Sequence, residues 1–364
     1  MKRCYVAGLV LAFALAGCSS GTISGTGSGT GQPSKGPAAV VTTADARKVL
    51  TQHAAGLNQA LHAGETSVLA QYVGGSSYTI RATAFKDPTI KQTPAQTFSR
   101  PRFYIPFQTT YPAWFVARVH QQASDGTSQD DYLVFTKASA SAPWLDVFEP
   151  VVIVKATQPT VATDKNGNAV AVPASQAGQL ALAPDALPAA QAKYLDPVTP
   201  AAGAGRPCPP GTSKPLAAKL GCTLTTPTTA TGSAAVTFSD GSTIVDLHDR
   251  SVFTSHGSGE IAITNRHTAT SDPVYALRTT DGGALVFYDL SASMVLSPAG
   301  AFAGLFSIDY PDLITKGKNQ DASFEVDYRE QFAVDEPQGT PAKPAVVAQF
   351  GGASAATCGG GPCK

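Results

Sequence analysis

The first 20 residues constrain this chain most, because they have the pattern of an export signal that a folded domain would not keep. A short basic segment, Lys2 and Arg3, precedes an apolar run from Tyr5 to Ala16. A tract rich in Gly, Ser and Thr follows from Ser19. This order of parts is typical of a secretory signal peptide. The apolar run is about half the ~20 residues that a membrane-spanning helix needs, so we expect export rather than a permanent transmembrane segment.

Cys18 makes this interpretation more specific. The sequence Leu15-Ala16-Gly17-Cys18 resembles the lipobox of bacterial lipoproteins. The resemblance implies that the Cys18 thiol carries a diacylglyceryl group and that cleavage takes place just before it. An ordinary signal peptide that happens to contain a cysteine is the alternative, and the position and flanks of Cys18 argue against it. We therefore expect an exported protein held through Cys18 on the extracytoplasmic face of the cell membrane.

Composition argues against two classes of function. The chain contains 26 Lys and Arg and 26 Asp and Glu, so its formal net charge is zero, and no basic patch or charged tail stands out. Nucleic-acid binding and electrostatic attraction to anionic lipid therefore have little support. Hydrophobic residues make up 43% of the 364 positions, which is sufficient for a folded core. The length suits two domains of ordinary size.

The cysteines predict disulfides. Cys4 leaves with the signal and Cys18 takes the lipid, so the mature chain retains Cys208, Cys222, Cys358 and Cys363. An even number in an exported protein favours bridges, and three connectivities are open. Proximity favours pairing within 208/222 and within 358/363. Neither pair has the Cys-x-x-Cys form or a His at ligand spacing, so structural bridges are favoured over a zinc site or a redox pair.

Changes in composition divide the chain. We expect a signal peptide with lipobox at residues 1–18, a flexible tether at 19–40, a first α+β domain at 41–198, a junction with a cysteine pair at 199–232, a second β-rich domain at 233–350, and a Gly-rich tail with the second cysteine pair at 351–364. The tether contains almost no large apolar side chain, so burial cannot offset the entropy of ordering it.

The spacing of apolar residues predicts helices first and strands afterwards. Thr42 and Asp45 stand in a capping-box arrangement, and apolar residues then recur at helical spacing until Gly64. His53 lies on this apolar stripe, and we expect a core or helix-edge residue rather than a ligand. From Ser76 the period shifts towards two, which is typical of strands. We expect strands at residues 78–85, 114–120, 132–136, 144–154, 235–238, 242–253, 260–265, 274–279, 284–290 and 323–332. The predicted fold class is α+β, with N-terminal helices followed by a curved antiparallel sheet and a second half rich in sheet.

Two further stretches have their own interpretation. Residues 97–112 interleave aromatic residues with prolines, and we interpret them as a loop packed over an open sheet, with a pocket lining as the alternative. Asn166-Gly167 predicts a hairpin turn, and residues 184–195 predict a short helix.

The two halves of the chain echo each other. Residues 112–118 followed by 131–135 parallel residues 273–278 followed by 284–287, each as strand, polar turn and strand. We therefore expect that two related α+β halves make up the chain.

Several of these features together resemble an uncharacterised family of actinobacterial lipoproteins that carry a domain of unknown function. The resemblance rests on the lipobox, the tether, the hairpin at Asp164–Val172, the stretches Leu182–Leu187 and Ala192–Leu195, and the strands Tyr275–Arg278 and Ala284–Tyr288. It implies an envelope location and no activity. The order of helices then strands in the first half is also similar to cone-shaped domains of the nuclear transport factor 2 type.

No stretch carries a catalytic signature of the Gly-x-Ser-x-Gly, Ser-x-x-Lys or His-Glu-x-x-His kind. Asp246 and His248 share a face of a predicted strand, as an Asp that orients a general-base His would. Glu325 and Asp327 have the spacing of paired carboxylates. Alternating polar residues are more typical of a solvated strand face, and residues 255–259 have the composition of a turn. We therefore predict no catalytic residue, no cofactor and no metal site.

The function that the sequence favours is a non-catalytic binding or interaction module of the cell envelope. Its partners would be the membrane, through Cys18, and an envelope protein or a small ligand. The alternative is an envelope hydrolase whose site is assembled from residues distant in sequence. A structural accessory of a membrane complex is a third interpretation. Converging Asp, His or Glu side chains in a deep pocket would favour the enzyme, whereas an aromatic-lined cleft would favour binding.

Overall fold

The computed structural model describes residues 38–86, 90–154, 156–195, 261–298, 324–339, 343–358 and 361–362. From Ala39 onward these residues belong to one unit of the chain. Several sequence predictions lie outside the described residues: the signal peptide with Cys18, most of the tether, the junction with Cys208 and Cys222, the strands at 235–238 and 242–253, Asp246, His248, the turn at 255–259, and Cys363.

Helix α1 (Thr43–Ala63) begins and ends where the sequence predicts. The Thr42 Oγ1 accepts from the Asp45 N–H at 3.2 Å, and the Asp45 Oδ2 accepts from the Thr42 N–H at 3.0 Å. This capping box satisfies two backbone donors at the start of the helix. Gly64 ends α1 at φ 66°, a left-handed conformation that costs glycine little. The short helix α2 (Thr66–Leu69) follows.

Residues 78–85 do not form the strand that we predicted. They belong almost entirely to helix α3 (Gly75–Ala84). Ser76, Ile80 and Thr83 are buried along α3, and their spacing places them on one helical face. Burial of that face overrides the local strand preference of Tyr, Thr and Ile, which reflects how a side chain fits a pleated surface more than an intrinsic backbone preference.

The strands of the first half are β1 (Gln96–Tyr104), β2 (Ala113–Ala123), β3 (Ser128–Lys137), β4 (Leu145–Phe148) and β5 (Val151–Val152). Strand β1 corrects our interpretation of residues 97–112 as a loop. Pro101 is accommodated because the register of β1 against β2 shifts between Ser99 and Arg102, and Arg100 takes a φ of 51°. Such an irregularity on an outer strand is one of the few places where a sheet tolerates proline.

The second half begins with a 3-10 turn (Pro184–Ala186) and helix α4 (Leu187–Leu195), as predicted. Its strands are β6 (Ile261–Ala269), β7 (Tyr275–Arg278), β8 (Ala284–Pro298), β9 (Phe324–Glu336), β10 (Ala345–Cys358) and β11 (Gly361–Pro362).

Strand β10 corrects the expected Gly-rich tail, because residues 351–358 continue a strand paired with β9. The small residues there allow close packing. A Cβ added at Gly352 would lie 2.7 Å from the Cγ2 of Ile80, so α3 crosses β10 at a place where only glycine fits.

The strands form one sheet in the order β1-β2-β3-β5-β10-β9-β8-β6, with β7 beside β8. The named strand pairs are antiparallel. Short β5 pairs with both β3 and β10 and so joins the two halves. The predicted hairpin around Asn166-Gly167 is confirmed. Ala171 bridges Leu277 of β7, and Val161 bridges Thr279 just beyond β7. Ala169 bridges Pro106, just beyond β1. Strand pairing therefore continues from β1 through the sheet to β7 and returns through the hairpin to the end of β1, which closes a circuit of paired segments.

A central core lies inside this circuit. It includes Tyr104, Val116, Tyr132, Val134, Phe148, Leu277, Leu285, Phe287, Ala333 and Ala348, drawn from both halves. The intervening residues of β3, Leu133 and Phe135, point to the other face of the sheet and pack with α1. In the same way Val286 and Tyr288 of β8 belong to a separate core with residues of α4.

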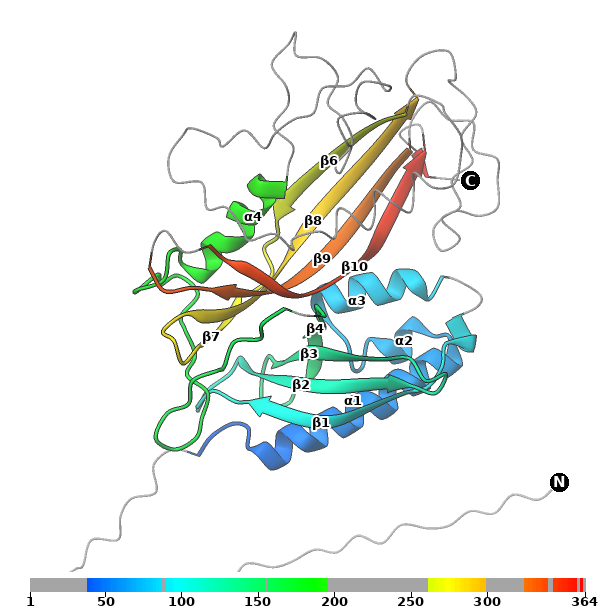
Figure 1. Ribbon diagram of the computed structural model, residues 1–364. Helices are drawn as coiled ribbons and strands as arrows, with labels where there is room; N and C mark the ends of the chain where they lie inside the picture. Colours follow the sequence, from blue (N-terminus) through cyan, green and yellow to red (C-terminus); the bar gives the residue numbers. More distant parts are fainter. Residues whose placement is uncertain are drawn as a thin grey trace, which may run out of the picture. The chain divides into compact units, whose positions relative to one another are not determined.

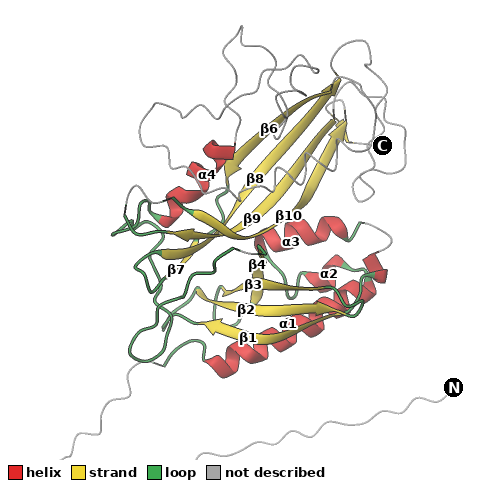
Figure 2. Ribbon diagram, in the orientation of Figure 1, coloured by secondary structure: helices red, strands yellow, loops and turns green. Residues whose placement is uncertain are grey.

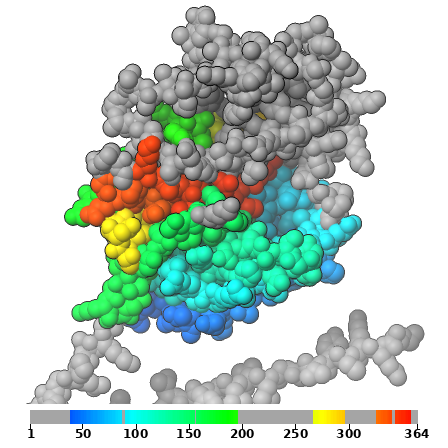
Figure 3. Space-filling model, in the orientation of Figure 1, coloured from blue at the N-terminus to red at the C-terminus, as the bar shows by residue number. Residues whose placement is uncertain are grey.

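The layers follow in the order α1, the strands of the first half, the central core, the strands of the second half, and α4. Figure 1 shows α1 on the outer side of β1–β3 and α4 beside β6 and β8. Figure 2 shows the same separation of helices from strands by colour. In the space-filling view of Figure 3, the teal and green atoms of the first half lie against the orange and red atoms of β9 and β10. The predicted α+β class, with N-terminal helices followed by an antiparallel sheet, is confirmed.

Candidate functional site

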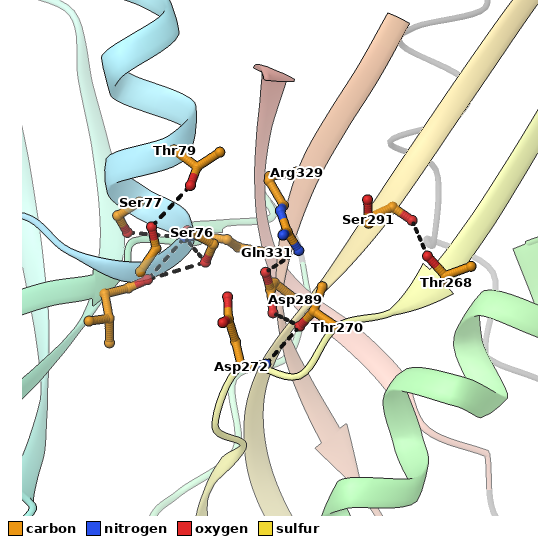
Figure 4. A network of polar contacts seen from close by, with 12 residues as sticks. Ser76, Ser77, Thr79, Thr268, Thr270, Asp272, Asp289, Ser291, Arg329 and Gln331 are labelled. Atoms are coloured by element: carbon orange, nitrogen blue, oxygen red, sulfur yellow. Dashed lines mark hydrogen bonds and ion pairs between the residues drawn. The ribbon is translucent and has the colours of Figure 1, made fainter. Parts of the chain in front are cut away.

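Gln331 of β9 joins the two halves through a buried polar network. Its Nε2 donates to the Oγ of Ser76 at 2.8 Å and to the Oγ of Ser77 at 3.0 Å, both at the start of α3. The same nitrogen lies 3.2 Å from the carbonyl oxygen of Val147, and the Gln331 Oε1 accepts from the Glu149 N–H at 2.8 Å. Figure 4 shows this amide reaching from β9 towards α3. One side chain therefore satisfies polar groups of three first-half segments.

Arg81 and Glu149 form an ion pair beside this network. The Arg81 Nε donates to both carboxylate oxygens of Glu149, at 2.7 and 2.9 Å, and the Arg81 Nη2 also donates to Oε2. Helix α3 supplies the arginine, and the turn between β4 and β5 supplies the glutamate. Fork-like pairing of this kind fixes geometry as well as charge. It holds α3 to the strand segment that connects the two halves.

Two further carboxyl groups and a histidine complete what we call the junction cluster: His53, Arg81, Asp131, Asp146 and Glu149. Asp131 of β3 is 2% exposed and Asp146 of β4 is 0% exposed. Burial, with the charge of Glu149 second, raises the pKa of Asp131 to about 7 and the pKa of Asp146 well above its usual value. The Oδ1 of Asp131 accepts from the Nε2 of Gln129 at 2.9 Å.

His53 faces Asp146 from α1. The His53 Nε2 lies 3.7 Å from the Asp146 Oδ2. Burial, followed by the charge of Arg81, lowers the pKa of His53 to about 3. At neutral pH the imidazole is therefore uncharged, and burial favours the protonated form of the Asp146 carboxyl. The predicted role of His53 as a core residue is confirmed.

A second polar group belongs wholly to the second half. The Thr270 Oγ1 donates to the Oδ1 of buried Asp289 and accepts from the Asp272 N–H at 3.2 Å. The Arg329 Nη1 lies 3.4 Å from the Asp289 Oδ2 (Figure 4). Burial raises the pKa of Asp289 to about 6. These contacts fix the turn between β6 and β7 against β8 and β9.

Of the candidate residues from the sequence, Glu325, Asp327 and Cys358 lie within the described residues, and none of them belongs to either polar group. Glu325 is exposed, Val326 and Tyr328 are buried, and Asp327 is half-buried, so the predicted alternation along β9 is confirmed. The Oε1 of Glu325 accepts from the Oγ of Ser293. Cys358 ends β10.

Sequence reasoning missed the junction cluster. Its one signal was the presence of acidic residues inside apolar stretches, as with Asp146 in Trp144–Val154. Chemically, a carboxyl group with a pKa near 7 can donate or accept a proton at neutral pH. Catalysis also requires that the group touch a substrate, and the burial of Asp131 and Asp146 opposes that contact.

The described residues contain no group of three or more His, Cys, Asp or Glu side chains placed to bind a metal ion. Among the helices that the structure describes, none has the length and apolar character to cross a bilayer.

Comparison with known proteins gives one match. The model of a domain of unknown function (DUF8094) matches the chain twice, over residues 37–214 and 196–358. The first match covers the described elements from α1 to α4, and the second covers strands β6 to β10. The repeated match is consistent with two related halves. No curated protein and no solved structure matches the chain.

Proposed function

Because this chain belongs to the DUF8094 family, whose domain has no known function, we propose a role for it from its own residues. We propose that it is an exported, lipid-anchored module of the cell envelope that acts by binding rather than by catalysis. The observation that carries the proposal is the burial of Asp131 and Asp146 within the junction cluster. Gln129 and His53, which contact these two carboxyl groups, belong to the first half, and the carboxyl groups do not face solvent, where a substrate would have to reach them. Their burial therefore favours binding over catalysis as the role of the chain.

The anchor in this proposal is a diacylglyceryl group on Cys18. The support is the sequence Leu15-Ala16-Gly17-Cys18 with the basic and apolar segments before it. A lipid with two acyl chains gives stable attachment, whereas one chain binds reversibly. The chain's zero formal charge offers no electrostatic alternative for attachment.

A capture experiment tests the binding role. The full chain, tagged at its C-terminus and expressed with its signal, is cross-linked in intact cells and then purified from detergent-solubilised envelopes. We expect saturable capture of a defined envelope protein or glycan, and untagged protein should compete for it. Turnover of envelope polymers by the purified chain, in the absence of saturable capture, would contradict the proposal.

A second candidate function is an envelope hydrolase, and one observation favours it. Asp131 has a pKa of about 7 beside the carboxylate of Glu149, as an acid–base residue would. The variant Asp131→Asn separates the two functions, because the amide keeps the shape of the carboxyl group and cannot exchange its proton. A binding module should keep its capture of the partner in this variant, whereas a hydrolase should lose turnover by at least about a hundredfold.

A further inference from the structure

The loop between β1 and β2 presents aromatic side chains to solvent. We call residues 105–112 the aromatic loop. Phe107 in this loop is 53% exposed and Tyr111 is 37% exposed. The sequence contains no charged side chain from Phe103 to Ala117, although charged residues make up 14% of the whole chain. Exposed aromatic side chains in a stretch of sequence without charged residues are candidates for a contact surface.

The aromatic loop is held in place by its own hydrogen bonds. The Gln108 Oε1 accepts from the Trp114 N–H at 3.0 Å, and the Gln108 Nε2 donates to the Trp114 carbonyl at 2.6 Å. The Ala169 N–H donates to the Ile105 carbonyl at 2.9 Å, which ties the loop to the hairpin. These hydrogen bonds hold the loop at Ile105 and at Gln108. The fold therefore keeps Phe107 and Tyr111 exposed to solvent.

The chain that leads to the anchor meets this same loop. The Val40 N–H donates to the Gln108 carbonyl at 2.8 Å. The sequence from Gly36 to Ala44 is also free of charged side chains. In Figure 1 the described chain before α1 begins at the end of the lower sheet where β1 ends and β2 starts. The aromatic loop and the entry of the tether therefore share one end of the first half.

The tether's length sets how closely this end is held to the bilayer. Between Cys18 and Val40 the chain, fully extended, spans at most about 75 Å at ~3.4 Å per residue. A Gly/Ser-rich segment of this length, which the composition predicts to be flexible, has a typical end-to-end distance of about 26 Å. The effective concentration of lipid at the aromatic loop is therefore high, so a weak affinity of the loop for lipid is sufficient.

We propose that the aromatic loop docks on the surface of the bilayer that holds Cys18, with Phe107 and Tyr111 entering the interface. This inference rests on the proposed anchoring. Aromatic rings favour the membrane–water interface, where the phenol of Tyr111 keeps its hydroxyl in water and its ring in the apolar region. Insertion of an uncharged loop desolvates no ion, so the contact is insensitive to salt.

Lipid-based quenching of fluorescence tests the docking. Full-length lipidated protein is reconstituted into phosphatidylcholine vesicles that contain brominated lipid, and Phe107→Trp places a probe in the loop. Val154→Trp is the matched control, because Val154 is 84% exposed and lies outside the loop. After subtraction of the parent signal, we expect the Phe107→Trp emission to shift to shorter wavelength and to be quenched at least twofold. The Val154→Trp emission should remain unquenched.

The outcomes separate the docking from the anchoring. If the protein floats with the vesicles but Phe107→Trp behaves like Val154→Trp, the anchor holds and the docking is wrong. If the protein does not float, the anchor fails and the docking loses its basis. A blue shift that needs native envelope and is absent in pure lipid vesicles would assign the loop to a protein partner and would also overturn the proposal.

A second measurement uses the released, soluble form of the Cys18→Ser chain, which carries neither the lipid nor the apolar signal segment. Its partition onto phosphatidylcholine vesicles should fall by at least about tenfold when Phe107 and Tyr111 are both replaced by Ser, because each large apolar side chain contributes roughly this factor on burial. The partition should not change between low and high salt. Equal partition with and without the two Ser substitutions would contradict the docking.

Discussion

The indole ring of Trp114 lies against the phenol ring of Tyr275, with centroids 5.1 Å apart and planes inclined at 53°. Trp114 belongs to β2 and Tyr275 to β7, and the two residues occupy matching positions in the internal echo of the sequence. A second contact between the halves, between Tyr132 and Phe287, has a centroid distance of 5.5 Å. The related halves therefore meet through related strands.

Loss of the Trp114 ring should destabilise both halves together. For Trp114→Ala we expect the free energy of unfolding to fall by about 3 kcal/mol, as for other large aromatic residues removed from a core. Urea unfolding followed by circular dichroism should remain a single transition with a lower midpoint. The exposed residue Val154 offers a control, since Val154→Ala should change stability by less than about 0.5 kcal/mol. Two separated transitions in the parent protein would show that the halves fold independently.

Removal of the Gln331 amide should lower the free energy of unfolding by more than the size of the group suggests. Gln331→Leu keeps the bulk of the side chain but leaves the hydroxyls of Ser76 and Ser77 and the Glu149 N–H without this partner. We expect a loss of about 1–3 kcal/mol, the usual cost of unsatisfied buried groups. Gln122→Leu on the exposed part of β2 is the matched substitution and should be nearly neutral. Equal stability of the two variants would show that the hydrogen bonds of Gln331 do not stabilise the contact between the halves.

Asp131 should make the protein less stable as pH rises. Its folded-state pKa of about 7 lies above the ordinary Asp value, so between these two pKa values the folded state binds a proton that the unfolded state has released. The free energy of unfolding therefore falls from this group as pH rises from about 4 to 7. His53 acts in the opposite direction, because its folded pKa of about 3 is lowered. The comparison with Asp131→Asn separates the two contributions.

Asp131→Asn should be more stable than the parent at pH 7, and this difference should shrink by about 2 kcal/mol on going down to pH 5. Urea midpoints measured at both pH values check the prediction. A stability difference that is constant between pH 5 and pH 7 would show that Asp131 does not hold a proton in the folded state.

The parts of the fold that could be predicted are those encoded in neighbouring residues. Thr42, Asp45 and Gly64 determine the ends of α1 through local hydrogen bonds and backbone conformation. The alternation along β9 needs only the two faces of one strand.

The parts that could not be predicted depend on distant residues. Helix α3 has strand-like composition, and its burial depends on Gly352 and Gln331, which lie more than 240 positions away. Strand β10 has the composition of a tail because α3 crosses it closely. The junction cluster has no motif at all, since Arg81 meets Glu149 only after α3 has packed on β4 and β9. The spacing of neighbouring residues carries no information on contacts between residues so far apart in the sequence.

The four cysteines of the mature chain should be oxidised. We expect no free thiol in the native exported protein, because paired cysteines form disulfides in an oxidising compartment. Alkylation without reductant, followed by mass spectrometry of peptides containing Cys208, Cys222, Cys358 and Cys363, measures this. Modification of Cys208 or Cys222 in the native protein would refute the predicted bridge between them.

Cys18 should determine attachment to the membrane. Each buried methylene contributes about 0.8 kcal/mol, and two acyl chains together hold a protein stably without help from charge. High salt should therefore leave the native protein on membranes, whereas detergent should extract it into the detergent phase. The Cys18→Ser variant should lack the lipid and should appear either as an uncleaved precursor or as a released soluble form. Fractionation with immunoblotting and mass measurement of the N-terminal peptide distinguishes these species. A native protein that salt removes, or a Cys18→Ser variant that stays on membranes at mature length, would mean that a partner protein rather than a lipid holds the chain.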